Sequence, residues 1–168
     1  MHLHRYEKIW IIFGTGALLA FLIILGIGAF YQGSQPPSCM VTIDPQNVQA
    51  HEAFKEENLG LNQVGENEYV VNILASAFNY DLGKDENGAP VKTIRIPAGA
   101  KVTFQATTSD VIHGFELAGT NVNMMLEPGY ISEYETTMDN PGTYTLICNE
   151  YCGTGHHLMY ATVEVYEE

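Results

Sequence analysis

The chain has 168 residues, of which 46% are hydrophobic, so it can hold one domain of ordinary size and a membrane anchor. Seven Lys and Arg residues stand against 20 Asp and Glu residues, which gives a formal net charge of −13 at pH 7. This balance leaves no basic patch for a nucleic acid, and no Ser-His-Asp set or phosphate-binding loop indicates hydrolytic or nucleotide chemistry.

The first predicted element is a transmembrane helix over residues 9–31, a stretch without any charged residue. A helix of this length, at about 1.5 Å per residue, spans the roughly 30 Å hydrocarbon core with some tilt. Trp10 and Tyr31 lie at its two ends, as interfacial aromatic residues do. A secretory signal is the alternative, but no A-x-A-like cleavage site follows, so an uncleaved anchor is favoured.

Residues 1–8 are predicted to form a cytoplasmic arm. Arg5 and Lys8 outnumber its single acid, Glu7, and the positive-inside rule keeps such an arm in the cytoplasm. The rest of the chain is then expected in the periplasm or on the outer face of a prokaryotic cell membrane. Five of the seven cations and 19 of the 20 acids lie in that outer part.

Residues 32–68 are expected to be a linker that leads into the outer domain. Pro36 and Pro37 stiffen it, and several glutamates keep it solvated. We expect at most one short helix here, over residues 48–59. Cys39 is the odd cysteine and has no assigned role, and His51 is interpreted as a surface residue.

Residues 69–168 predict an all-β domain. Val102, Phe104 and Ala106 share one face of a segment in which every second residue is apolar, the period of a half-buried strand. Glycine and proline turns separate the segments, which favours an antiparallel sandwich. The predicted strands cover residues 69–74, 91–96, 101–106, 111–116, 131–136, 142–147 and 159–166.

Soft metal ligands gather near the end of the chain. Cys148, Cys152, His156 and Met159 fall within twelve residues, and His113 lies on a separate apolar strand. Thiolate, thioether and imidazole together favour copper, whereas structural zinc uses Cys and His in paired knuckles and haem c needs C-x-x-C-H. Three alternatives stay open at this point: a mononuclear copper site with one cysteine left over, two thiolates that bridge two coppers, and a disulfide.

The order C-x-E-x-C-x-x-x-H-x-x-M, preceded by a strand that bears the first histidine, resembles the CuA domain of cytochrome c oxidase subunit II. The resemblance implies a cupredoxin-like Greek-key barrel with a dinuclear copper centre. Its implied ligands are two bridging thiolates, one imidazole for each copper and two weak ligands: Cys148 and Cys152, His113 and His156, and Met159 with the backbone carbonyl of Glu150.

Further expectations follow from the resemblance. The run Tyr6-Glu7-Lys8-Ile9-Trp10 resembles the start of subunit II in the B-type heme-copper oxidases, where a glutamate marks the mouth of a proton path into subunit I; a solvated carboxylate is the alternative. In many subunit II chains the side chain at the position of Glu150 reaches a magnesium ion at the contact with subunit I, whereas some B-type members have no acid there, so the resemblance leaves both readings of Glu150 open. Phe78 and Tyr80 occupy the aromatic segment where an electron donor docks, with ordinary core packing as the alternative.

The function implied is that of the electron-accepting subunit of a terminal heme-copper oxidase. Single electrons pass from cytochrome c or a similar donor through the copper centre to haem in subunit I, which alone holds haems and reduces oxygen. The acidic exterior would steer a basic donor, unless it reflects adaptation to salt. Two alternatives are the CuA subunit of a nitric oxide reductase and a membrane-anchored copper-binding or copper-delivery protein.

Overall fold

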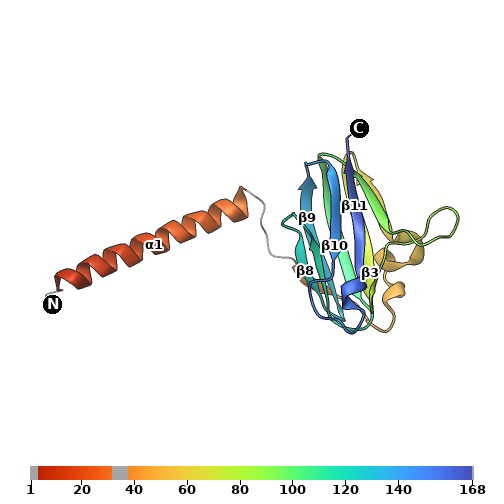
Figure 1. Ribbon diagram of the computed structural model, residues 1–168, viewed down its shortest axis with the longest axis horizontal. Helices are drawn as coiled ribbons and strands as arrows, with labels where there is room; N and C mark the ends of the chain where they lie inside the picture. The colour runs from red at the N-terminus through yellow and green to blue at the C-terminus, as the bar shows by residue number, and fades with distance from the viewer. Residues whose placement is uncertain (1–3, 32–37, 168) are drawn as a thin grey trace. The chain divides into compact units, whose positions relative to one another are not determined.

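The computed structural model describes residues 4–31 and 38–167. The chain divides into two compact units, residues 1–35 and residues 36–168, and each is described by itself. The first contains the helix α1 (Arg5–Phe30), and the second contains eleven strands (Figure 1).

Among the described residues, α1 is the one helix that is long and apolar enough to cross a membrane. It begins at Arg5, so the second half of the predicted arm forms its first turn. The backbone N–H of His4 donates to the Glu7 carboxylate at 2.8 Å, and the N–H of Tyr6 donates to Nδ1 of His4 at 3.5 Å. These bonds satisfy N–H groups that a helix start otherwise leaves open, which explains the earlier beginning.

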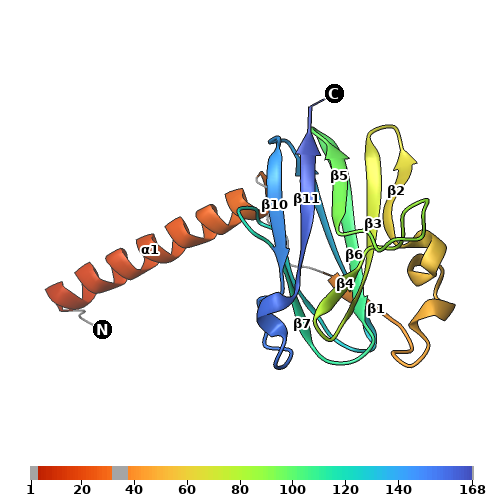
Figure 2. The ribbon, with the colours of Figure 1, turned by 45° about the vertical axis from the view of Figure 1, so that its right-hand side comes forward.

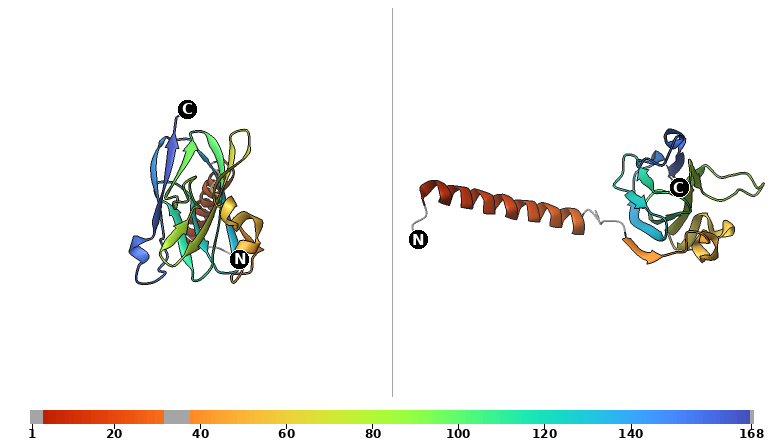
Figure 3. Two further views of the ribbon diagram at one scale, coloured as in Figure 1. Left: turned by 90° about the vertical axis from the view of Figure 1, so that its right-hand side faces the viewer. Right: turned by 90° about the horizontal axis from the view of Figure 1, so that it is seen from below.

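The second unit is a sandwich of two sheets, as the sequence predicts, with the cupredoxin-like architecture expected from the resemblance. One sheet has the order β1-β9-β6-β3-β2 with β4 beside β3, and the other has the order β5-β11-β10-β7-β8. Figure 2 shows β10, β11 and β5 side by side, with β3 and β2 to their right, and Figure 3 shows the sandwich from two further sides. The strands of the first sheet are β1 (Ser38–Thr42), β2 (Gly60–Gly65), β3 (Glu68–Ser76), β4 (Asn79–Asp81), β6 (Ala100–Thr108) and β9 (Tyr130–Met138). Those of the second are β5 (Thr93–Pro97), β7 (His113–Leu117), β8 (Asn123–Leu126), β10 (Gly142–Ile147) and β11 (Tyr160–Tyr166).

Two strand pairs are parallel, which the expected antiparallel sandwich did not include. β3 pairs with β6 in parallel, and β11 pairs with β5 in parallel. The chain leaves β3, passes through β4 in the first sheet and β5 in the second, and returns to the first sheet at β6 in the same direction. Such a crossover between sheets gives a parallel neighbour, whereas a hairpin gives an antiparallel one.

Much of the segment that the sequence suggested as a linker is part of the sheet. β1 pairs with β9, and β2 pairs with β3. Between them lie three 3₁₀ turns in place of the single short helix: Val48–Ala50, Glu52–Phe54 and Glu56–Asn58. Phe54 is fully buried and packs with Val48 and Ile131 in a small apolar cluster. Residues 38–65 are therefore held by the same sandwich as the predicted domain.

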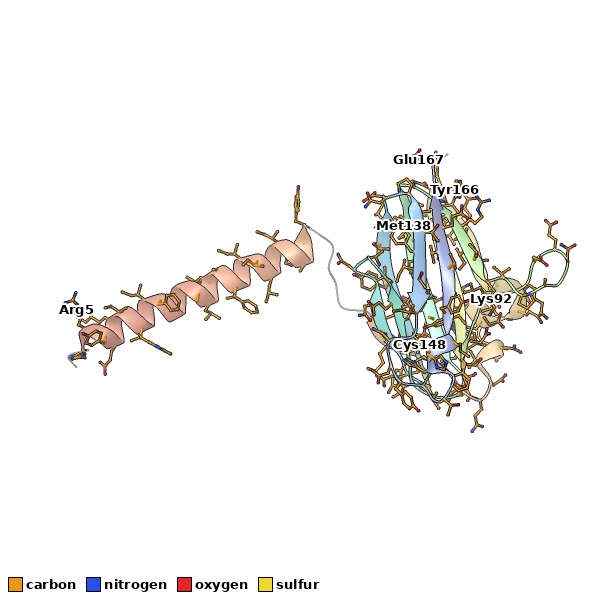
Figure 4. The ribbon with its side chains drawn as sticks, in the orientation of Figure 1. Arg5, Lys92, Met138, Cys148, Tyr166 and Glu167 are labelled. Atoms are coloured by element: carbon orange, nitrogen blue, oxygen red, sulfur yellow. The ribbon has the colours of Figure 1, made fainter. Side chains whose placement is uncertain are left out.

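The main core lies between the two sheets, where Phe104, Phe115 and Tyr80 are in ring contact. Loops join the strands at both ends of the sandwich. Cys148 lies toward the end opposite to Tyr166 and Glu167 (Figure 4). The predicted metal ligands belong to the loops at that end, because β7 begins with His113 and the 148–159 segment joins β10 to β11.

Candidate metal centre

The loop between β10 and β11 carries most of the predicted ligands. These two strands pair along their whole length, and the last pair is Ile147 with Tyr160. The N–H of Cys148 donates to the carbonyl of Met159 at 3.3 Å, so both ends of the loop are clamped together. His113 comes from β7, which pairs with the other side of β10. Two adjacent strands and one closed loop thus fix every candidate ligand.

The side chains predicted as ligands do come together. Sγ of Cys148 lies 3.8 Å from Sγ of Cys152 and 4.0 Å from Nδ1 of His113, and ligand atoms of these three residues all lie within 4.8 Å of one another. Sγ of Cys152 lies 3.6 Å from Nδ1 of His156 and 3.9 Å from Sδ of Met159. The two imidazoles therefore approach different sulfur atoms.

These spacings fit bound metal better than a disulfide. Both cysteines are free thiols, and their separation of 3.8 Å is far beyond the roughly 2.05 Å of an S–S bond. Ligand atoms on one small metal ion lie roughly 3–4 Å apart, because each bond is about 2.0–2.3 Å long. Two thiolates, two imidazoles and a thioether form a soft donor set that suits copper.

The site is screened from water, and this affects the protonation of its thiols. Cys148 is 6% exposed and His113 is fully buried. Burial and the neighbouring Cys148 raise the pKa of the Cys152 thiol to about 11, so the metal-free chain keeps this proton at neutral pH. A metal that binds as a thiolate complex must displace that proton, and the positive charge of the metal drives the displacement.

Asp110 orients the buried histidine. Its Oδ1 lies 2.9 Å from Nε2 of His113, which leaves Nδ1 facing the Cys148 sulfur. The carboxylate also accepts the N–H of Val111 at 2.7 Å and that of Ala77 at 2.5 Å. Partial burial alone would raise the pKa of Asp110, but the hydrogen bonds from His113, Val111 and Ala77 outweigh it and hold this pKa below its ordinary value. The charged carboxylate fixes the tautomer in which Nδ1 is free to bind metal.

We expect Asp110→Asn to weaken copper binding roughly tenfold, since loss of an outer-shell partner of a ligating histidine typically costs ten- to a hundredfold in affinity. The amide keeps the size of the carboxylate but loses the charge that orients the ring. Competition with a colorimetric Cu(I) chelator measures the effect. Asp139→Asn, which changes an exposed acid away from the site, is the matched control, and equal affinities for the two variants would contradict the role of Asp110.

Gly114 lets the ligand loop lie against β7. Its N–H donates to Sγ of Cys148 at 3.4 Å. A Cβ at this position would come within 1.9 Å of Oδ1 of Asn149 and within 2.7 Å of the backbone N of Glu150. Only glycine therefore permits this approach.

Tyr80 corrects one sequence-based expectation. Its side chain is 1% exposed, so it offers no surface on which a donor could dock. Its hydroxyl instead donates to the Gly114 carbonyl at 2.5 Å, beneath the ligand loop. Burial raises the pKa of the phenol, and the nearby Cys148 raises it further, so the hydroxyl stays a donor. Tyr80 supports the strand that carries His113.

Phe78, the other predicted docking residue, lies at the surface and against the ligand loop. It is 37% exposed and has a positive φ of 70°, a strained conformation for a bulky residue. A Cβ at Gly153 would come 3.1 Å from its ring, and a Cβ at Gly155 would come 2.5 Å from it. The two glycines thus leave room for the ring, which covers the loop.

The remaining predicted positions lie apart from this cluster or at its margin. The Glu150 carbonyl is 3.1 Å from Sγ of Cys148, while the side chain of Glu150 is exposed. His157, the neighbour of His156 in the chain, is exposed. Glu7 belongs to α1, where its carboxylate accepts the His4 N–H. The side chain of Cys39 lies outside the described residues.

Sequence reasoning missed the roles of Asp110 and Gly114, although both lie in the segment Asp110-Val-Ile-His113-Gly-Phe115. A carboxylate three residues before a candidate histidine ligand is a signal for an orienting partner. A glycine directly after that ligand is a signal for close backbone approach. The burial of Tyr80 had no comparable signal, because an aromatic residue in a short strand can face either way.

Comparison with known proteins agrees with this site. The family described as cytochrome c oxidase subunit II, periplasmic domain, matches residues 79–166. A cytochrome c oxidase subunit 2 of Thermus thermophilus is 35% identical over 164 residues, which cover 96% of this chain and 92% of the relative. A second sequence of that name from Thermus thermophilus is 37% identical over 135 residues, which cover 80% of this chain and 93% of the relative.

One solved structure resembles nearly the whole chain. It is a chain of a heme-copper terminal oxidase dimer determined by cryo-electron microscopy, with 29% sequence identity and a TM-score of 0.77. The match covers 96% of this chain and all of the other. The apolar helix α1 and the sandwich that follows are thus both matched. We conclude that this membrane-anchored, copper-binding chain belongs to the cytochrome c oxidase subunit II family.

Proposed function

We propose that the chain is the electron-accepting subunit of a terminal heme-copper oxidase, and that its copper centre is the dinuclear CuA type. The observation that carries the proposal is the division of the ligands between two sulfur atoms. His113 and the Glu150 carbonyl approach Cys148, whereas His156 and Met159 approach Cys152. A mononuclear site would gather both imidazoles around one thiolate and would leave the other unused.

In this proposal Cys148 and Cys152 bridge, His113 and His156 each bind one ion, and Met159 and the Glu150 carbonyl are weak ligands. Copper held in this way supplies a one-electron couple. The protein holds the ligands in nearly fixed positions, because the loop ends are clamped between β10 and β11 and Asp110 fixes the His113 ring. A rigid site supports fast electron transfer, since little rearrangement accompanies the change of charge.

The partners follow from the family. Electrons arrive from a c-type cytochrome or a similar small donor and leave to haem in subunit I, where oxygen is reduced. The proposed arrangement places the start of α1 in the cytoplasm of a prokaryotic cell and the sandwich on the outer side. The exposed Glu150 carboxylate is free to bind a magnesium ion at the contact with subunit I, and Glu7 to take part in proton uptake.

Electron acceptance can be measured on the full chain in detergent micelles after loading with copper. Mixed anaerobically with reduced mitochondrial cytochrome c, it should take up one electron per chain, and its visible absorption should bleach as the cytochrome is oxidised. Samples prepared without copper should oxidise no cytochrome. A loaded chain that takes up no electron from cytochrome c or dithionite would refute the proposed function.

A further inference from the structure

The start of the ligand loop is fastened to the edge strand β8. Nδ2 of Asn149 donates to Oδ1 of Asn123, the first residue of β8, at 3.2 Å. Within residues 38–167, this is the one hydrogen bond that joins the loop to another strand without using a metal-ligand atom. The strand is itself held firmly, because Met124 and Leu126 are buried in the main core. We call the contact between the two asparagines the Asn latch.

The Asn latch holds the part of the loop that carries a weak ligand. Asn149 stands between Cys148 and Glu150, and the carbonyl of Glu150 lies 3.1 Å from the Cys148 sulfur. Oδ1 of Asn149 lies directly over Gly114, where an added Cβ would come within 1.9 Å of it. The Asn149 side chain therefore reaches from Gly114 in β7 to Asn123 in β8, and it fixes the piece of chain that presents the Glu150 carbonyl.

Copper binding makes this support more important. In the metal-free chain, the Cys148 thiol donates a hydrogen bond to the Glu150 carbonyl. Copper binds the thiolate, so the proton of this hydrogen bond is lost and the sulfur no longer attracts the carbonyl. A hollow of about 250 Å³ lies beside the Asn latch, lined by β7, β8 and residues 149–150, so the segment has room to move away. The Asn latch is then the hydrogen bond that remains to keep the carbonyl near the metal.

We propose that Asn123 is a positioning residue for the copper centre: through Asn149 it keeps the Glu150 carbonyl beside the metal and so lowers the reduction potential. The proposal rests on the copper centre proposed above and adds a residue outside the ligand loop. Axial ligands and hydrogen bonds around the cysteine sulfur tune the potential of copper–thiolate sites. A carbonyl oxygen is a hard ligand that favours the oxidised centre, so its retreat should raise the potential.

Asn123→Leu removes the acceptor of the Asn latch without a change in charge and at similar side-chain size. The copper-loaded full chain in detergent should keep its copper content, and its equilibrium with a soluble one-electron mediator should shift toward the reduced centre by roughly threefold, within what one hydrogen bond contributes. At 59 mV per tenfold for one electron, this is an upward shift of roughly 30 mV. Asn121→Leu, the same change at an exposed residue of the β7–β8 turn, is the matched control and should leave the potential unchanged.

Two further variants test whether the asparagines act through their mutual hydrogen bond. Asn149→Ala removes the donor, and the double variant with Asn123→Leu should shift the potential no more than the larger single shift, because both changes break the same contact. Asn123→Asp keeps an acceptor for the Asn149 amide and adds a negative charge that favours the oxidised centre, so its potential should not rise.

Equal potentials of the Asn123→Leu variant and the wild type would overturn the proposal, and so would shifts that add in the double variant. Loss of copper from a folded Asn123→Leu chain would overturn it as well, because the contact would then serve the assembly of the site rather than its potential. Failure of the proposed function itself looks different: the wild-type chain would bind a single copper or would accept no electron from dithionite.

Discussion

Replacing Cys152 by serine should destroy the shared copper centre and lower the rate of electron acceptance at least a hundredfold. A hydroxyl is a hard and weakly acidic ligand, so it cannot replace a soft bridging thiolate. Cys152 is also the sulfur that both His156 and Met159 approach, so its loss removes the thiolate that would share a copper ion with these two ligands. Electron spin resonance of the loaded variant should show at most a single copper ion with its electron on one nucleus.

Cys39→Ser is the matched control, since it removes the third cysteine of the chain by the same chemical change. It should keep the copper content and the spectrum of the wild type. A Cys152→Ser variant that still bound two coppers with one shared electron would show that Cys152 does not bridge.

Substituting Gly114 by alanine should destabilise the domain by about 1–3 kcal/mol, the usual cost of forcing an extra methyl group into closely packed structure. The added Cβ would meet backbone N atoms of the ligand loop at 2.6 and 2.7 Å, and backbone cannot rotate away as a flexible side chain can. The loop must then move from β7, which breaks the hydrogen bond from the Gly114 N–H to the Cys148 sulfur. Chemical unfolding of the copper-free chain measures the stability, and the spectrum of the loaded chain reports the distortion.

Gly65→Ala in β2 is a suitable control. The three atoms nearest to its Cβ would belong to the side chain of Glu68 and lie at 3.2 Å or more, a much looser approach than the one at Gly114. We expect a change in unfolding free energy within about 0.5 kcal/mol and an unchanged copper spectrum. Equal stabilities of the two alanine variants would mean that the close approach at Gly114 is not needed.

The ligand set could be predicted from the sequence because most of it is local. Cys148, Cys152, His156 and Met159 lie within one loop, so their spacing in the chain carries much of their geometry. His113 is distant in sequence and was identified through the resemblance. The division of the imidazoles between two sulfurs depends on how β7 lies beside β10, which spacing alone does not determine.

Elements that depend on distant pairing were harder to predict. β1 and β2 are short, and they are stabilised by pairing with β9 and β3 rather than by a strong alternating pattern. β8 was missed as well, because Asn123–Leu126 has only two buried side chains, Met124 and Leu126. Tyr80 was expected at a docking surface, yet packing against Phe115 and the bond to Gly114 place it inside. The formation of these short strands and the burial of Tyr80 depend on tertiary contacts, which a local sequence pattern does not reveal.

The central claim is that Cys148 and Cys152 hold two copper ions between them, and one measurement tests it most directly. The full chain in detergent is loaded with copper, its metal content per chain is counted, and its electron spin resonance spectrum is recorded. Two coppers per chain, with one unpaired electron split by two equivalent copper nuclei, is the predicted result. One copper per chain, with the electron confined to a single nucleus, would contradict the bridged centre and with it the proposed route of electrons into the oxidase.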